Sequence, residues 1–88
     1  MTRLSIHFIV PRGEEHFLRS RLMTVQSSLY HWLRETGYGV FFWDEADRLE
    51  PYLTIHEVKA SKAKRVREKI ELVAAQNGFA VTIEAETG

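Results

Sequence analysis

Two histidines and one glutamate are the residues of this chain that could together bind a metal or transfer a proton. His7, His56 and Glu84 lie in three separate stretches that alternate apolar and polar residues. Two imidazoles and a carboxylate form a ligand set that zinc and other divalent metals accept, and two imidazoles could also form a proton-transfer pair. The sequence does not fix the register that would bring them together, and strand histidines are more often pH-sensitive surface groups. We therefore predict no catalytic residue, no metal site and no cofactor.

A second group of candidates is aromatic. Residues 40–43 are apolar at every position, so alternation does not tell which pair faces the core. If Val40 and Phe42 point inward, Phe41 and Trp43 lie on the opposite face, and a slip of one residue would exchange the pairs. Neighbouring candidates on the third strand are Tyr52 and His56. Either arrangement leaves an unusually apolar surface, which is typical of a contact site.

A third group is basic. Six Lys or Arg residues and a single acid, Glu68, fall between residues 59 and 69. A cation in the first turns of a helix interacts unfavourably with the helix dipole, which costs about 0.3–1 kcal/mol of stability for each charge. This cost indicates that the cations were selected for binding an anionic partner. Lys62, Arg65 and Lys69 share one edge of this helix. The alternative interpretation is a solvated helix face with internal pairs such as Arg67 to Glu71.

The elements that must position these residues follow from hydrophobic periodicity. Period two is typical of strands and period 3.6 of helices. The pattern predicts strands at residues 3–10, 38–44, 52–59 and 79–84 and helices at 14–35 and 62–76, with the last three residues frayed. Within the third strand we expect Leu53 and Ile55 to face inward, and His56 and Val58 to face outward.

The order is therefore β-α-β-β-α-β in a single domain, residues 1–88. Two right-handed crossovers joined by a hairpin predict a four-stranded antiparallel sheet with both helices on one face. The first and third strands would be central. This is the α+β ferredoxin-like plait, a fold that hosts many unrelated activities.

The first helix carries one further candidate surface. Met23 and Tyr30 lie opposite its core-facing stripe. Single exposed apolar residues are normal on a helix. Met and Tyr are, however, enriched in interfaces, so the alternative is a partner contact.

Composition excludes several classes of protein. Twelve basic and twelve acidic residues cancel, there is no cysteine, and 44% of the residues are apolar. A neutral chain shows no bulk attraction to nucleic acid or membrane, and its short apolar runs predict no membrane span. The absence of cysteine fits a cytoplasmic protein.

These features favour a non-enzymatic regulatory or adaptor module that works through protein contacts, including self-association as a homodimer. Its contact residues would be Phe41, Trp43, Tyr52, His56, Lys62, Arg65, Lys69, Met23 and Tyr30. One alternative is a nucleic-acid-binding domain that uses the basic helix and the sheet aromatics. A third is a small dimeric enzyme or metal-binding protein that uses His7 and His56.

Overall fold

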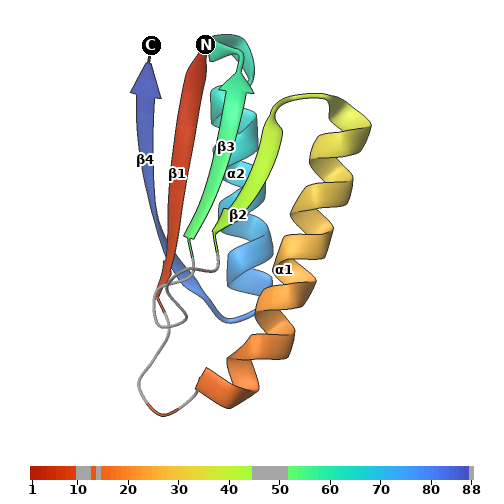
Figure 1. Cartoon of the computed structure of the whole chain (residues 1–88), viewed down its shortest axis with the longest axis vertical. Helices are drawn as coiled ribbons and strands as arrows, with labels where there is room; N and C mark the ends of the chain where they lie inside the picture. The colour runs from red at the N-terminus through yellow and green to blue at the C-terminus, as the bar shows by residue number, and fades with distance from the viewer. Residues whose placement is uncertain (10–12, 14, 45–51, 88) are drawn as a thin grey trace.

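A four-stranded antiparallel sheet carries both helices on one face (Figure 1). The computed structural model of the chain describes residues 1–9, 13, 15–44 and 52–87, without the side chains of residues 15–19, 43, 44, 52 and 87. The elements are β1 (Thr2–Ile9), α1 (Glu15–Thr36), β2 (Val40–Asp44), β3 (Tyr52–Val58), α2 (Ala60–Gln76) and β4 (Ala80–Thr87). The strand order β2-β3-β1-β4 makes β1 and β3 central, so the predicted ferredoxin-like plait is confirmed.

The core lies between the sheet and the helices. On β1, the alternation predicted from the sequence sends Leu4, Ile6 and Phe8 toward the helices, where each is at most 2% exposed. α1 contributes Leu29 and α2 contributes Ile70, both fully buried. Burying a side chain of this size stabilises the fold by about 1.5–3 kcal/mol, so this layer holds the two helices on the sheet.

α2 begins and ends at different kinds of signal. It begins at Ala60 after Lys59, two residues before the predicted start at residue 62, and no side chain caps its N-terminus. At the other end, the Phe79 N–H donates to the Ala74 carbonyl at 2.8 Å, and Gly78 adopts a φ of +80°. This is the left-handed termination that a glycine favours, and α2 ends at Gln76 as the sequence predicted.

β4 is longer than its sequence pattern predicted. It runs to Thr87, which pairs with Thr2, and Glu86 pairs with Arg3. The Arg3 guanidinium also donates to the Glu86 carboxylate, which links the start of β1 to the end of the neighbouring strand β4. The prediction of a frayed end was wrong for Glu86 and Thr87, because the alternation pattern does not report backbone pairing with β1, and Gly88 lies outside the described residues.

The faces of β2 are fixed by its pairing with β3. Phe41 pairs with Ile55 and Phe42 pairs with Thr54, and paired residues share a face of the sheet. Gly39, just before the strand, lies where an added Cβ would be 2.6 Å from Ile55 Cγ2. The absence of a side chain there lets the start of β2 approach the core closely.

β3 contains a bulge that reverses its alternation. Thr2 pairs with Val58 and Leu4 with Ile55, so His56 and Glu57 together lie opposite Arg3. Glu57 adopts a φ of +59°, the left-handed region that non-glycine residues rarely occupy. The extra residue turns Val58 inward, where it is fully buried. The prediction that Val58 faces outward was therefore wrong.

Candidate functional site

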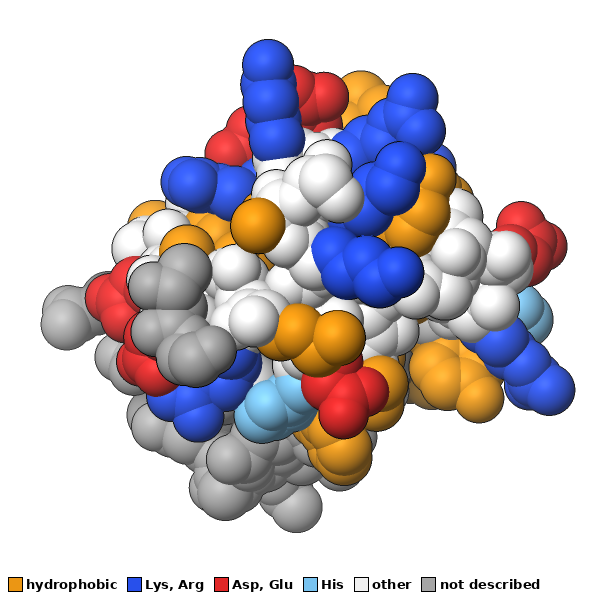
Figure 2. Space-filling model, turned by 90° about the horizontal axis from the view of Figure 1, so that it is seen from above, with side chains coloured by type: hydrophobic (Ala, Val, Ile, Leu, Met, Phe, Trp, Pro, Cys, Tyr) orange, Lys and Arg blue, Asp and Glu red, His pale blue; other side chains and the backbone are white. Residues whose placement is uncertain are grey.

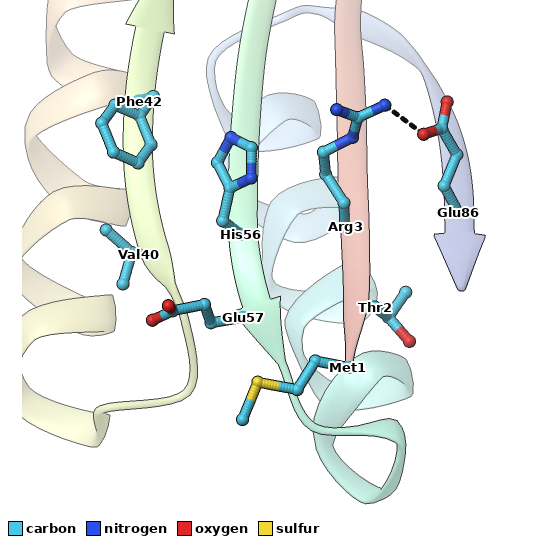
Figure 3. Close-up of a pocket in the computed structure, with 8 residues that line it drawn as sticks. All are labelled: Met1, Thr2, Arg3, Val40, Phe42, His56, Glu57 and Glu86. Carbon is cyan, nitrogen blue, oxygen red and sulfur yellow. Dashed lines mark hydrogen bonds and ion pairs between the residues drawn. The ribbon is translucent and has the colours of Figure 1, made fainter. Parts of the chain in front are cut away.

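The β2 side of the open sheet face carries exposed apolar side chains. We call Met1, Val40, Phe42 and His56 the β2 corner. Phe42 is 55% exposed and Val40 is 42% exposed. The Phe42 and His56 rings meet edge to face, with centroids 5.1 Å apart, and they lie on neighbouring strands (Figure 3). A solvated aromatic pair on an open sheet is typical of a contact surface.

A shallow hollow lies beside the β2 corner. Its volume is about 640 Å³, and the strained Glu57 lines it together with His56. The remaining lining residues are Met1, Thr2, Arg3, Val40, Phe42 and Glu86 (Figure 3). Backbone strain of this kind is concentrated at functional sites, which supports this part of the sheet as a candidate site.

The structure corrects the predicted position of one aromatic residue. Phe41 is half-buried against the core and meets the Tyr30 ring edge to face, with centroids 6.1 Å apart. It therefore does not lie on the open face, and Phe42 takes that position. The sequence left this choice open because every residue of 40–43 is apolar. The side chains of Trp43 and Tyr52 lie outside the described residues, so their predicted contact role stays a prediction.

The register keeps the two strand histidines apart. His7 pairs with Tyr52, whereas His56 pairs with Val40. The two positions are therefore four residues apart along β3, about 13 Å of strand. Glu84 pairs with Ser5 and lies between them in register. Among the described residues, no cluster of three His, Asp or Glu side chains could hold a metal. Within one chain, His7 and His56 therefore form no shared site, and their use in a dimeric enzyme or metal-binding protein stays a prediction.

The opposite edge of the sheet is acidic. Glu84 and Glu86 occupy the open face of β4. Glu86 forms an ion pair with Arg3 in which both side chains are about half exposed. The open face is thus apolar along β2 and charged along β4, and the two edges suit different kinds of contact.

A second candidate surface lies on the helix side, between the end of α1 and the start of α2. We call Trp32, Tyr38, Lys62, Arg65 and Lys69 the cationic groove. Arg65 Nη1 donates to Tyr38 Oη at 3.3 Å, and Lys62 Nζ lies 5.1 Å from the centre of the same ring. Lys69 Nζ lies 5.9 Å from the Trp32 ring centre, and the two rings meet edge to face at 5.5 Å. The three predicted cations thus lie together.

A hollow of about 320 Å³ opens at the cationic groove. Thr36, Glu68 and the exposed Leu72 complete its lining. Figure 2 looks onto the end of the molecule where α2 begins and shows Lys and Arg side chains gathered beside an apolar surface. The groove therefore combines positive charge from α2 with apolar surface from α1, α2 and the connection that holds Tyr38.

The charges of the cationic groove act on Tyr38. The hydrogen bond from Arg65 and then the charge of Lys62 hold the pKa of the Tyr38 hydroxyl below its ordinary value of 10.0. Both groups are cations, and a nearby positive charge favours the negatively charged phenolate. The shift marks a positive potential at the mouth of the groove.

Sequence reasoning identified the three cations but missed their aromatic partners. Trp32 lies within the predicted first helix, residues 14–35, and packs partly against the core. Tyr38 fell in the predicted second strand, but the strand begins at Val40 and Tyr38 belongs to the connection before it. The two glycines that flank Tyr38 were the available signal, since glycine marks an irregular segment.

The outer face of α1 is exposed as predicted. Met23 is 66% exposed, and Tyr30 is partly exposed beside His31 and Phe41. A role for these two residues in partner binding stays a prediction. Within the described part of the chain, neither helix combines the length and apolarity needed to cross a membrane.

Comparison with known proteins places the fold and nothing finer. No protein-family model matches the chain, and no curated protein resembles it in sequence. Among solved structures, the de novo designed protein Foldit4 superposes with a TM-score of 0.70 at 16% identity, over 99% of this chain and 97% of that one. The de novo designed protein Ferredog-Diesel gives a TM-score of 0.53 at 21% identity, over 94% and 82%.

A natural protein is also similar in structure. A putative antibiotic biosynthesis monooxygenase from Nitrosomonas europaea superposes with a TM-score of 0.60 at 11% identity, over 100% of this chain and 98% of that one. At such identities the likeness shows a shared fold only, since one fold hosts many functions.

Proposed function

We propose that this chain is a small regulatory or adaptor module that works through protein contacts, and that the β2 edge of its sheet binds a second copy of the chain. The observation that carries the proposal is the exposed Phe42, which stands beside His56 and Val40 with more than half of its surface in water. Leaving a phenylalanine so exposed is unfavourable for an isolated domain, because its burial would contribute about 1.5–3 kcal/mol.

The charges on the two edge strands favour β2 as the contact. An unpaired edge strand is a template for pairing with another chain, and charged side chains protect against it. β4 presents Glu84 and Glu86 on its open face, so two copies of β4 side by side would bring like charges together. From Val40 to Trp43, β2 carries no charged residue. A copy therefore meets less repulsion at β2.

A two-fold contact at β2 would also use Phe42 efficiently. If two β2 strands pair antiparallel about Phe42, each Phe42 lies beside the Phe42 of the second copy, so both exposed rings are covered at the axis. The result is one eight-stranded sheet with four helices on one side. The helices and the cationic groove then stay accessible to other partners, as an adaptor requires.

The first test is the solution mass by light scattering over a range of concentrations. The intact chain should form a dimer that dissociates on dilution, and Phe42→Lys should be monomeric throughout. Ile9→Lys is the matched control, because Ile9 is 54% exposed against 55% for Phe42 and lies on the same face at the far end of β1. Ile9→Lys should dimerise normally. A monomeric intact chain at every concentration would overturn the proposal.

The second test exploits the absence of cysteine from the chain. Under mild oxidation, Phe42→Cys should form a disulfide-linked dimer, because the two-fold contact brings these positions within the short Cβ separation that a disulfide needs. Ile9→Cys should stay largely uncrosslinked. Equal crosslinking of both variants would show that copies meet without a specific contact at β2, and the proposed arrangement would fail.

A further inference from the structure

The cationic groove lacks the acidic partners that surface cations usually find. In the part of the chain that the structure describes, Lys62, Arg65 and Lys69 form no ion pair with a carboxylate. The one acidic residue that lines the hollow, Glu68, lies 3.9 Å from Lys64 instead. The first turn of α2 also contains no acid, so no carboxylate there offsets the positive end of the helix dipole.

The aromatic rings hold these cations in position. Lys62 rests over Tyr38, Lys69 rests over Trp32, and the hydrogen bond to the Tyr38 hydroxyl fixes Arg65. A long side chain loses about 0.5–1.5 kcal/mol of rotamer freedom when an interface immobilises it. Contacts that already restrict the three side chains lower this cost, so the groove is preorganised for an anion.

We infer that the cationic groove binds single-stranded nucleic acid. The three cations are three and four residues apart on α2, about 4.5 and 6 Å of helix rise. That span exceeds one phosphate, since phosphates of one strand are spaced about 3.4 Å along a duplex axis and farther apart in an extended strand. Single-strand binders combine such a positive track with aromatic rings against which bases stack, and here Trp32 and Tyr38 supply the rings.

The ring chemistry separates this inference from an acidic protein partner. A carboxylate-rich segment would use the cations but gain little from two aromatic rings and the exposed Leu72 beside them. A nucleotide offers both a phosphate and a flat, apolar base face. The groove lies on the helix-covered side, whereas Phe42 lies on the open face of the sheet, so the groove and the proposed self-association use different surfaces.

The test is fluorescence anisotropy with a labelled oligodeoxythymidylate of about ten nucleotides. If three phosphates are engaged, the affinity should fall with a logarithmic salt slope of about 2, or roughly 20-fold between 50 and 200 mM salt. The double variant Arg65→Gln/Lys69→Gln should lose about tenfold in affinity or more, and its salt slope should fall below about 1, because each lost phosphate contact removes about 0.7.

The matched control removes the same charge from the other flank of the same helix. Lys64 and Arg67 are both exposed and line neither hollow, so Lys64→Gln/Arg67→Gln should keep nearly full affinity and the original slope. Thermal unfolding of both double variants checks that each remains folded. Equal losses in the two variants would mean that only overall charge matters and would overturn the inference.

A second readout reports on the rings directly. The chain has two tryptophans, so a Trp43→Phe parent leaves Trp32 as the sole indole. Stacking of a base should quench its fluorescence in proportion to the bound fraction. Polyglutamate of the same length is the competing acidic partner. Polyglutamate binding as tightly as the oligonucleotide, or oligonucleotide binding without a change at Trp32, would overturn the inference.

Discussion

Phe41 and Phe42 are identical neighbours on β2 that lie on opposite faces of the sheet. Phe41 is half-buried among core side chains and contacts Tyr30 of α1. Phe42 is 55% exposed, and its ring meets His56 on the open face of the sheet. One residue type thus serves the core on one face and forms a candidate contact on the other. The pairing of β2 with β3, not the composition of the strand, therefore decides which phenylalanine joins the core and which is exposed.

The same contrast holds for the two faces as wholes. The helix-covered face is filled by aliphatic and aromatic side chains that exclude water. The open face is apolar at β2 and acidic at β4. Changes on the covered face should therefore act on folding, and changes on the open face should act on association.

The largest expected effect separates Phe41 from Phe42. Phe41→Ala should lower the free energy of unfolding by about 2–3 kcal/mol, since it leaves a gap against Tyr30 and the core. Phe42→Ala should change it by no more than about 0.5 kcal/mol, as for other exposed positions. Urea unfolding at a concentration low enough to keep the chain monomeric measures both. Equal losses of stability would contradict the assignment of Phe41 to the core face and Phe42 to the open face.

An intermediate effect on the free energy of unfolding is expected at Glu57. This residue forms the bulge that turns Val58 toward the core. Glu57→Val should lower the free energy of unfolding by about 1–2 kcal/mol, because a β-branched residue is strained at positive φ. Glu57→Gly should be neutral or stabilise by up to about 1 kcal/mol, since glycine adopts this conformation without a steric penalty.

Thermal unfolding of the two Glu57 variants distinguishes the bulge from a regular strand. In a regular strand, valine is favoured and glycine is not. A Glu57→Val protein more stable than Glu57→Gly would therefore show that β3 alternates without interruption, and that Val58 faces the solvent.

The smallest effect lies at the exposed rim of the helix side. Arg65→Gln should raise the pKa of Tyr38 toward its ordinary value of 10.0, because it removes the main group that favours the phenolate. Spectroscopic titration of the tyrosines, with Tyr38→Phe to identify its signal, measures the change. An unchanged titration would show that Arg65 does not contact the hydroxyl.

The lowered pKa of Tyr38 also sets the sign of a weak pH dependence. The folded state favours the phenolate, so this contribution to stability is fully present above the unfolded pKa of 10.0. It is lost as the pH falls through the lower folded value. The intact chain should therefore gain stability relative to Arg65→Gln as the pH rises toward 10.0, and loss instead of gain would contradict the assignment.

The sequence by itself determined the element order, the central strands and the core face of β1, because these follow from local periodicity and from the handedness of crossovers. It also identified the three cations on one edge of α2. The tertiary structure alone decided which face Phe41 and Phe42 occupy, since pairing with β3 sets a register that a uniformly apolar strand cannot encode.

The bulge at Glu57 and the cationic groove were likewise beyond the sequence. A single inserted residue reverses the alternation of β3 without changing its composition, and so buries Val58. Tyr38 and Arg65 are 27 residues apart and meet only when both helices pack on one face of the sheet. Local patterns fix what each segment becomes, but contacts between distant segments depend on the packing of the whole.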